Sequence, residues 1–254
     1  ASGARLVNNT VYQLTGNAVT IESGSDNLTV RNNILVVDNG LGLDVVGLRQ
    51  SNFQSDYNLL HVTGTGQLGR WQGREFSSRV DWFYELGFDG HSLVADPRFV
   101  SPAGPDGLLG YNGADYGQDD DFHLGSDSPG IDAGLASDPF LREPVPNGDR
   151  INLGRYGNTA EATSSPLQMV QVLSPNGLEK FEVGQPVTIQ WRSAGLTPNR
   201  PVLLMNAGGS ASENWQADNY QTVPGSTGTI LEVVDRSALS DAAATNGCAF
   251  GLVA

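Results

Sequence analysis

The residues best suited to chemistry lie in a glycine-rich acidic stretch that ends at residue 121. Clustered carboxylates among flexible glycines suit Ca²⁺, which takes about six to eight oxygen ligands in loose geometry. The stretch is not an EF-hand, because the spacing differs and the distal Glu is absent. Two readings stay open, a calcium site and a solvated acidic loop. The candidate ligands are Asp106, Asp115, Asp119, Asp120 and Asp121.

A second set of residues has the types needed for acid–base work on a glycan: Asp44, Asp56, His61 and Arg49. An inverting glycosidase needs two carboxyl groups about 6.5–9.5 Å apart. Asp44 and Asp56 are separated by half of the repeat described below, so we expect them on different faces. We therefore predict no complete catalytic set in this chain and interpret His61 as a turn or surface residue.

An internal repeat indicates which elements position these residues. Three segments align on Asn9, Asn33 and Asn58, which are spaced 24 and 25 residues apart. Solenoid repeats commonly take about 20–45 residues. Asn tolerates left-handed backbone angles and bonds neighbouring backbone groups, so stacked copies would form a ladder inside a solenoid. The alternative is that these are ordinary loop asparagines of a β-sandwich.

Short alternating segments place three strands within one repeat, at residues 18–21, 28–30 and 34–37. Because alternate side chains of a strand face opposite sides, one set should point inward. The inward residues are predicted to be Val19, Ile21, Leu28, Val30, Ile34 and Val36.

Residues 56–165 carry a series of ordered motifs. The phrases are Asp96-Pro97-Arg98-Phe99, Asp121-Phe122-His123-Leu124, Ser128-Pro129-Gly130-Ile131-Asp132-Ala133-Gly134 and Gly154-Arg155-Tyr156. This order resembles the final coils and terminal cap of bacterial right-handed parallel β-helix proteins of the pectate-lyase-like superfamily, choice-of-anchor type. The resemblance is specific for fold. It is weak for function, because the superfamily holds lyases, hydrolases, epimerases and non-enzymatic adhesins.

An aromatic and polar cluster lies within this region. Exposed aromatic rings can stack on sugars, which would make the cluster a carbohydrate platform. An open solenoid end, however, exposes apolar side chains and unpaired backbone groups that must be covered. The resemblance places these residues in an excursion that plugs that end, so we favour a cap. The cluster is Trp71, Trp82, Phe83, Tyr84 and His91.

The C-terminal part has a resemblance of its own. Ser174-Pro175-Asn176-Gly177 leads to Val187-Thr188-Ile189-Gln190-Trp191, a pattern similar to the Ig-like domain of the Ser-Thr-rich anchored type. Val187, Ile189 and Trp191 alternate and should face a sandwich core. Further strands are expected at 202–205 and 230–234, and the small polar residues 157–167 suggest a linker.

Composition limits the function classes. The net charge is −14, so the chain should repel phosphate backbones, and nucleic acid is not an expected partner. No apolar run is long enough to span a membrane. Cys248 is the sole cysteine, which excludes an internal disulfide and is typical of a buried small apolar residue.

The sequence therefore predicts an all-β chain, with the C-terminal part of a right-handed parallel β-helix (1–160) followed by an Ig-like β-sandwich (161–254). The expected function is an extracellular or cell-surface structural or adhesive module that contacts a polysaccharide or cell-surface glycan. The alternative is the accessory C-terminal part of a polysaccharide lyase or hydrolase whose active site lies upstream of residue 1. Self-association through the open N-terminal coil is a further expectation.

Overall fold

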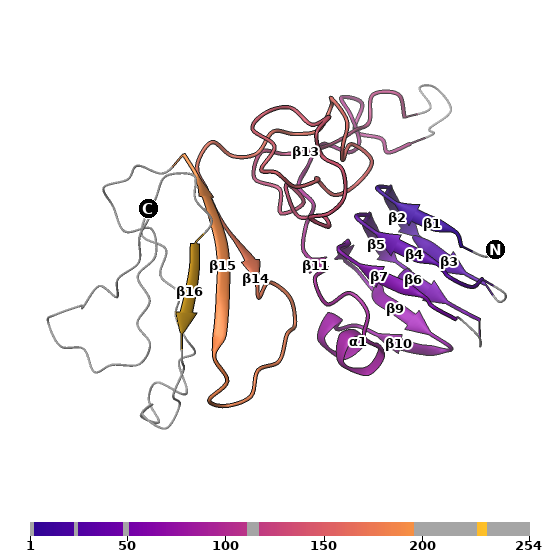
Figure 1. Cartoon of the computed structure of the whole chain (residues 1–254). Helices are drawn as coiled ribbons and strands as arrows, with labels where there is room; N and C mark the ends of the chain where they lie inside the picture. Colours follow the sequence, from indigo (N-terminus) through magenta and orange to yellow (C-terminus); the bar gives the residue numbers. More distant parts are fainter. Residues whose placement is uncertain (1–2, 23–24, 48–50, 111–116, 196–227, 233–254) are drawn as a thin grey trace, which may run out of the picture. The chain divides into compact units, whose positions relative to one another are not determined.

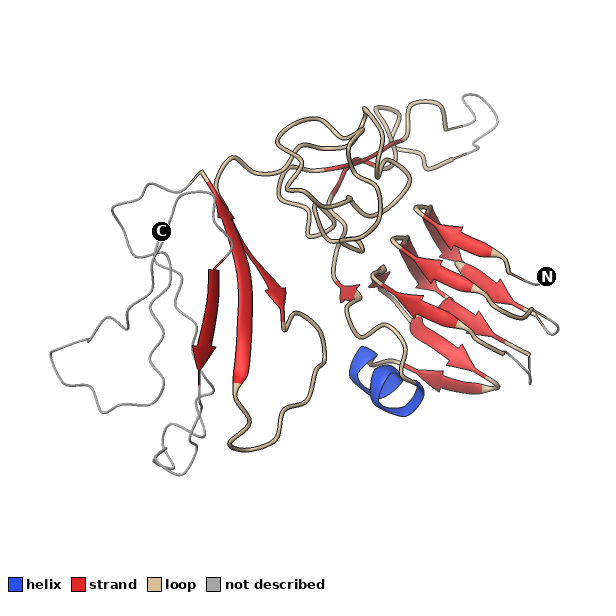
Figure 2. Cartoon of the chain, viewed as in Figure 1, coloured by secondary structure: helices blue, strands red, loops and turns tan. Residues whose placement is uncertain are grey.

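A computed structural model describes residues 3–22, 25–47, 51–110, 117–195 and 228–232. Over these residues the chain consists of short β-strands and one α-helix, which confirms the all-β prediction (Figure 2). The chain divides into two compact units, Ala1–Pro166 and Leu167–Ala254. Within the described ranges, no helix is long and apolar enough to cross a membrane.

Three parallel sheets organise the first unit, and each repeat of the chain adds one strand to each sheet (Figure 1). The first sheet holds β1 (Arg5–Val7), β4 (Thr29–Arg31) and β7 (Gln54–Asp56). The second holds β2 (Thr10–Thr15), β5 (Ile34–Asn39), β8 (Leu59–Val62) and β11 (Leu93–Val94). The third holds β3 (Val19–Ile21), β6 (Leu41–Val45), β9 (Gln67–Trp71) and the antiparallel β10 (Arg74–Phe76).

The strand register reproduces the spacing of the aligned asparagines. Leu6 of β1 pairs with Val30 of β4, and Val30 pairs with Ser55 of β7. Paired residues are thus 24 and then 25 positions apart, as Asn9, Asn33 and Asn58 are. The three sheets end together at β1, β2 and β3. Self-association through this edge stays a prediction.

Two adjacent positions form the corner between the first two sheets, one through its backbone angle and the other through its side chain. The left-handed backbone angle falls on Asn8, Asn32 and Tyr57, with φ of 56°, 55° and 55°. The residue after each of these forms the predicted ladder. Asn9 Nδ2 donates to Asn33 Oδ1 over 3.1 Å, and Asn33 Nδ2 donates to Asn58 Oδ1 over 3.0 Å. The Asn33 amide therefore accepts from one neighbouring repeat and donates to the other.

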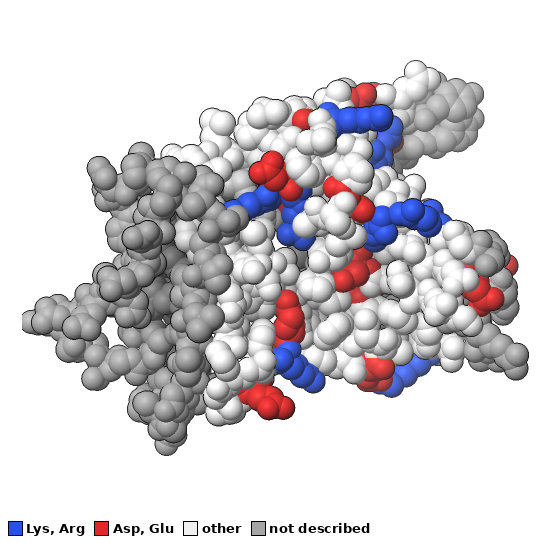
Figure 3. Space-filling model, in the orientation of Figure 1, with Lys and Arg blue, Asp and Glu red and all other residues white. Residues whose placement is uncertain are grey.

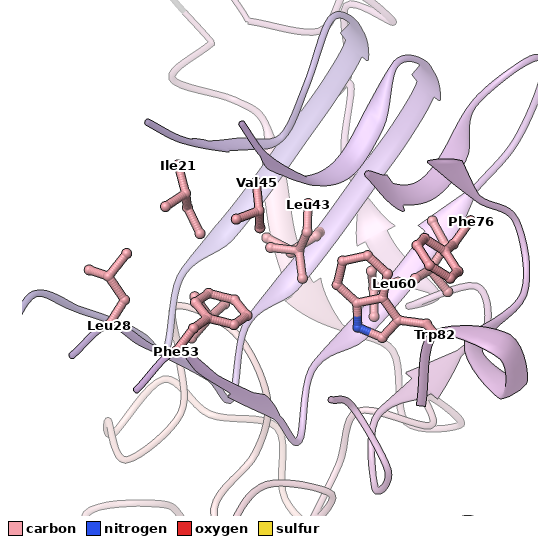
Figure 4. Packing of buried hydrophobic residues seen from close by; sticks show 11 residues of the cluster. Ile21, Leu28, Leu43, Val45, Phe53, Leu60, Phe76 and Trp82 are labelled. Atoms are coloured by element: carbon pink, nitrogen blue, oxygen red, sulfur yellow. The ribbon is translucent and has the colours of Figure 1, made fainter. Parts of the chain in front are cut away.

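The apolar core lies between the three sheets (Figure 4). Each sheet contributes fully or nearly fully buried side chains, such as Val30 from the first, Leu60 from the second and Leu43 from the third. Burial of one such aliphatic side chain stabilises a fold by about 1.5–3 kcal/mol. Because the core is a column along the stack, its end requires a cover.

Helix α1 (Arg79–Leu86) provides that cover. It begins at Ser78, whose side chain accepts from Asp81 N, and it ends at Gly87, whose φ of 81° few other residues adopt. Trp82 is fully buried in the core cluster, where its ring lies edge-on to Phe76 (Figure 4). Gly69 admits the indole, since a Cβ there would lie 3.0 Å from it. Trp82 of the aromatic cluster thus covers the end of the core, whereas Tyr84 of the same cluster is exposed.

Residues 97–110 and 117–165, called here the covering segment, run back over the outer face of the second sheet. They include β12 (Phe99–Ser101) and the antiparallel β13 (Asp121–Leu124). Leu124, Ile131 and Leu153 of this segment pack against the second sheet in a separate core cluster. Leu153 N bonds to Gly130 O, and Gly154 N bonds to Asn32 O over 2.8 Å.

The covering segment corrects one sequence prediction. Ile34 and Val36 were expected to point inward, but they lie on the outer face in contact with this segment, whereas Leu35 points into the inner core. Strand β5 begins Ile-Leu-Val-Val and is buried on both faces. A strand that is apolar on both faces carries no alternation from which inward and outward residues can be assigned.

The suggested linker is also corrected in part, because most of it packs on the first unit. Thr163 Oγ1 donates to Leu124 O over 2.6 Å, and Ser165 Oγ donates to Asp132 Oδ1 over 2.9 Å. Ala162 and Ser165 are buried. Small polar side chains are compatible both with a flexible linker and with close packing. Composition alone therefore could not distinguish a linker from a packed segment.

The described part of the second unit is an antiparallel sheet in the order β14 (Met169–Ser174), β15 (Val187–Ala194) and β16 (Gly228–Glu232). Trp191 is buried on β15, as the alternation predicted. The strand predicted at 202–205 lies outside the described residues, as does Cys248.

Candidate functional site

A pocket of about 260 Å³ lies where the covering segment meets strand β2. The lining residues are Thr10, Tyr12, Leu109, Gly110, Asp120, Phe122 and Arg155. Two of them belong to β2 and five to the covering segment, so the pocket exists only because the chain folds back on itself. Gly154 permits the approach, since a Cβ there would lie 2.6 Å from Thr10 Oγ1 and 2.7 Å from Ile34 Cδ1.

Aromatic rings form one wall of this pocket. The ring centroids of Tyr12 and Phe122 are 5.7 Å apart. Behind them Phe99 contacts both, at 6.2 Å from Tyr12 and 5.3 Å from Phe122. Rings held by such contacts offer a fixed apolar face at little cost in side-chain entropy. Tyr12 points outward because Val11, its neighbour on β2, packs against the inner core.

Two opposite charges also line the pocket. Arg155 N donates to Thr10 Oγ1 over 3.1 Å, and the Arg155 guanidinium lies 4.8 Å from the Tyr156 ring centroid. Asp120 Oδ2 accepts from Gly110 N over 2.7 Å. Asp120 Oδ1 is shielded from solvent and has no hydrogen-bond partner. A buried acceptor without a partner costs about 1–3 kcal/mol, and because Oδ1 is shielded, a ligand in the pocket would contact the other carboxylate oxygen.

The predicted calcium ligands occupy this region, but each described one is used by the loop itself. Asp106 Oδ1 accepts from Leu108 N, and Asp119 Oδ2 accepts from Asp106 N. Asp121 accepts from the backbone and ring of His123; these contacts lower the pKa of Asp121, although burial works in the opposite direction. Asp115 lies outside the described residues. Over the described ranges, no three His, Cys, Asp or Glu residues are grouped to hold a metal, and the calcium site stays a prediction.

The acid–base candidates are not brought together, because their strands belong to three different sheets. Asp44 is on β6 of the third sheet, where Arg70 donates to both of its carboxylate oxygens over 2.9 and 2.7 Å. Asp56 is on β7 of the first sheet and contacts His91 Nδ1 over 2.7 Å. His61 is on β8 of the second sheet, and Arg49 lies outside the described residues.

The aromatic cluster that could have bound sugar has other partners. Trp82 Nε1 donates to the buried carboxylate of Asp89 over 3.0 Å. Trp71 contacts Phe53 and Phe88, and His91 stacks on Tyr57 with ring planes 4° apart. Trp71, Trp82 and His91 are therefore engaged in packing within the first unit, and the wall of the pocket beside β2 comes from other rings.

Sequence reasoning identified only Asp120 among the pocket residues. Thr10 and Arg155 are 145 positions apart, and no repeat connects them. One signal was present, because Phe122 alternates with Asp121 and His123 along β13, so the two sides of this strand carry different chemistry.

Charge around the site is mixed. On the face shown in Figure 3, acidic and basic side chains lie in small mixed groups instead of one patch of a single sign. Ion pairs account for several of them, including Arg31 with Asp138 and Arg98 with Asp127. The described residues on this face therefore form no extended basic groove for a polyanion. Comparisons with protein-family models, with curated proteins and with solved structures find no match to this chain.

Proposed function

We propose that this chain is an extracellular or cell-surface module that contacts glycans. In this proposal the first unit is the C-terminal part of a right-handed parallel β-helix, and the second is an Ig-like β-sandwich. Three parallel sheets with a repeat of 24 and 25 residues and an internal asparagine ladder support the first assignment. The antiparallel order of β14, β15 and β16 with a buried Trp191 supports the second.

One observation carries the glycan proposal: the pocket beside β2 combines a fixed aromatic face with polar groups of both kinds. A sugar ring has an apolar C–H face and a rim of hydroxyl groups that donate and accept. Tyr12 and Phe122 suit the face, while Asp120 and Arg155 suit the rim. Ligand sites commonly combine apolar walls with a few placed polar groups.

A glycan array probed with the labelled chain tests this proposal. Phe122→Leu keeps an apolar side chain but removes the ring from the pocket, so it should lower the array signal by about tenfold, equivalent to about 1.4 kcal/mol, the upper part of the range for one aromatic contact. Phe99→Leu is the matched control, because Phe99 contacts the same rings without lining the pocket. Absence of binding to any glycan, or equal loss in both variants with unchanged melting, would contradict the proposal.

A further inference from the structure

We propose that the pocket beside β2 selects a neutral pyranose residue, with Asp120 and Arg155 as the specificity-determining pair. This inference rests on the proposed glycan-binding function and deepens it. Three features of the pocket argue for that ligand class: its size, its charge balance and the fixed carboxylate of Asp120.

The size of the pocket fits one or two sugar rings. A volume of about 260 Å³ is smaller than the roughly 300–1,000 Å³ typical of sites for larger ligands. Thr10 and Tyr12 come from a strand, and Phe122 comes from another strand, so the walls are set by backbone hydrogen bonding. A ring lying on Tyr12 or Phe122 would share this small pocket with Asp120 and Arg155.

The charge balance separates neutral from acidic sugars. Arg155 alone would favour a uronate, but Asp120 lines the same small pocket and would repel a carboxylate. The chain as a whole carries a net charge of −14, which also opposes the approach of a polyanion. A neutral ring avoids both penalties, because its hydroxyl groups accept from the guanidinium and donate to the carboxylate.

The carboxylate of Asp120 favours a ligand rich in donors. Gly110 N donates to Asp120 Oδ2, which fixes the carboxylate. Because Oδ1 is shielded from solvent, a ligand hydroxyl would have to approach at Oδ2. Such a hydroxyl forms a charge-assisted bond, which is roughly twice as strong as a neutral one. A carboxylate offers no donor at that position at neutral pH.

Calorimetric titration of the full chain tests the inference. The probes are neutral tetrasaccharides of glucose, mannose, galactose and xylose, with tetragalacturonate as the acidic counterpart. Each is titrated at about 0.05 and 0.5 M NaCl, because salt screens charge–charge attraction and leaves binding of a neutral ligand nearly unchanged. We expect a neutral probe to bind with little salt dependence and tetragalacturonate to bind more weakly.

Two variants assign the roles within the pocket. Asp120→Asn and Arg155→Gln should each weaken the neutral probe by about tenfold, since each removes one charge-assisted bond. Asp127→Asn and Arg142→Gln are matched controls on exposed side chains outside the pocket and should leave affinity unchanged. Arg155 is exposed, so its variant should keep the wild-type melting temperature.

The unfavourable outcomes separate the two proposals. Preferred binding of tetragalacturonate, strongly weakened by salt and by Arg155→Gln alone, would overturn the neutral-sugar inference and keep the glycan proposal. Neutral binding that is unchanged in both pocket variants would also overturn the inference, because the site would lie elsewhere. Failure of every probe here, together with an empty glycan array, would overturn both.

Discussion

The side-chain amide of Asn58 donates to Asp89 Oδ1 over 3.0 Å, and this bond ends the asparagine ladder on a carboxylate. Three more donors reach the same carboxylate, from Ser55, Ser92 and Trp82. An asparagine here would place an NH₂ group among groups that already donate. The last position of the ladder therefore requires two acceptor oxygens, which explains why the series of amides stops at an aspartate.

Asp89→Asn should lower the free energy of unfolding of the first unit by about 2–3 kcal/mol, because at least one buried donor loses its acceptor. Urea denaturation followed by tryptophan fluorescence would measure the loss. Asp81→Asn is a matched control on the exposed side of α1 and should cost about 0.5 kcal/mol. Equal stability of Asp89→Asn and the wild type would mean that the carboxylate is not needed to end the ladder.

The repeat was predictable from the sequence because the corner residues are chemically constrained. Asn33 must bond both neighbouring repeats, so its type and its spacing are visible without a structure. The end of the ladder was not visible, because the excursion that contains α1 moves Asp89 to 31 positions after Asn58. Because the residue type changes from Asn to Asp and the spacing changes from 25 to 31 positions, the sequence shows no periodic signal at Asp89.

The covering segment limited what could be predicted about both faces of the sheets. Ile34 was assigned to the wrong face because the first four residues of β5 are all apolar. The pocket residues Tyr12 and Arg155 are joined only by the return of the chain over the second sheet, and nothing local in either segment encodes that path. The positions of the strands were thus predictable from the sequence, whereas the contacts between distant segments were not.

Asp138 should hold the covering segment to the stacked strands. Its carboxylate accepts two bonds from Arg31, over 2.7 and 2.8 Å, and one from Asn32 Nδ2 over 2.7 Å. Asp138→Asn should cost about 1–2 kcal/mol, since paired charge-assisted bonds in a half-buried position are lost. Hydrogen exchange should increase in peptides of residues 130–165 and stay unchanged in the inner strands.

The exposed pair of Arg98 and Asp127 provides the comparison for that experiment. Its side chains are 54% and 70% exposed, against 22% and 12% for Arg31 and Asp138. Exposed ion pairs contribute little, so Asp127→Asn should leave exchange and stability within measurement error. Similar effects of the two variants would show that Asp138 has no special role in holding the segment.

Glu143 should make stability depend on pH. Burial raises the pKa of this carboxyl, and the nearby charge of Asp132 adds to the increase, whereas bonds from Asn158 N and Asn152 N oppose it. Oε1 accepts both of these backbone bonds, and Oε2 is buried without a partner. A folded-state pKa above the unfolded value means that the stabilising contribution is present below the ordinary value of 4.5 and is lost as pH rises through the folded pKa.

Glu143→Gln should remove this loss, so the difference in melting temperature between the variant and the wild type should grow in favour of the variant from about pH 4.5 upward. Differential scanning calorimetry between pH 4 and 8 would measure it. Asp89 is also buried with a raised pKa, but it is present in both proteins and cancels in the difference. Glu75→Gln, on an exposed side chain, should show no such trend, and a constant difference for Glu143→Gln would contradict the argument.

Calcium binding by the acidic stretch would appear as a stability change confined to the first unit. A ligand present at about 100 times its Kd stabilises the folded state by about 2.7 kcal/mol, which corresponds to roughly 5–10 °C in melting temperature for a unit of this size. Adding a chelator should lower the melting temperature of the first unit by that amount and leave the second unit unchanged. Asp119→Asn should abolish the response, and Asp96→Asn, outside the stretch, should keep it. Identical melting with and without chelator would contradict the calcium site. The carboxylates of Asp106, Asp119 and Asp120 would then serve to accept the backbone bonds of the loop.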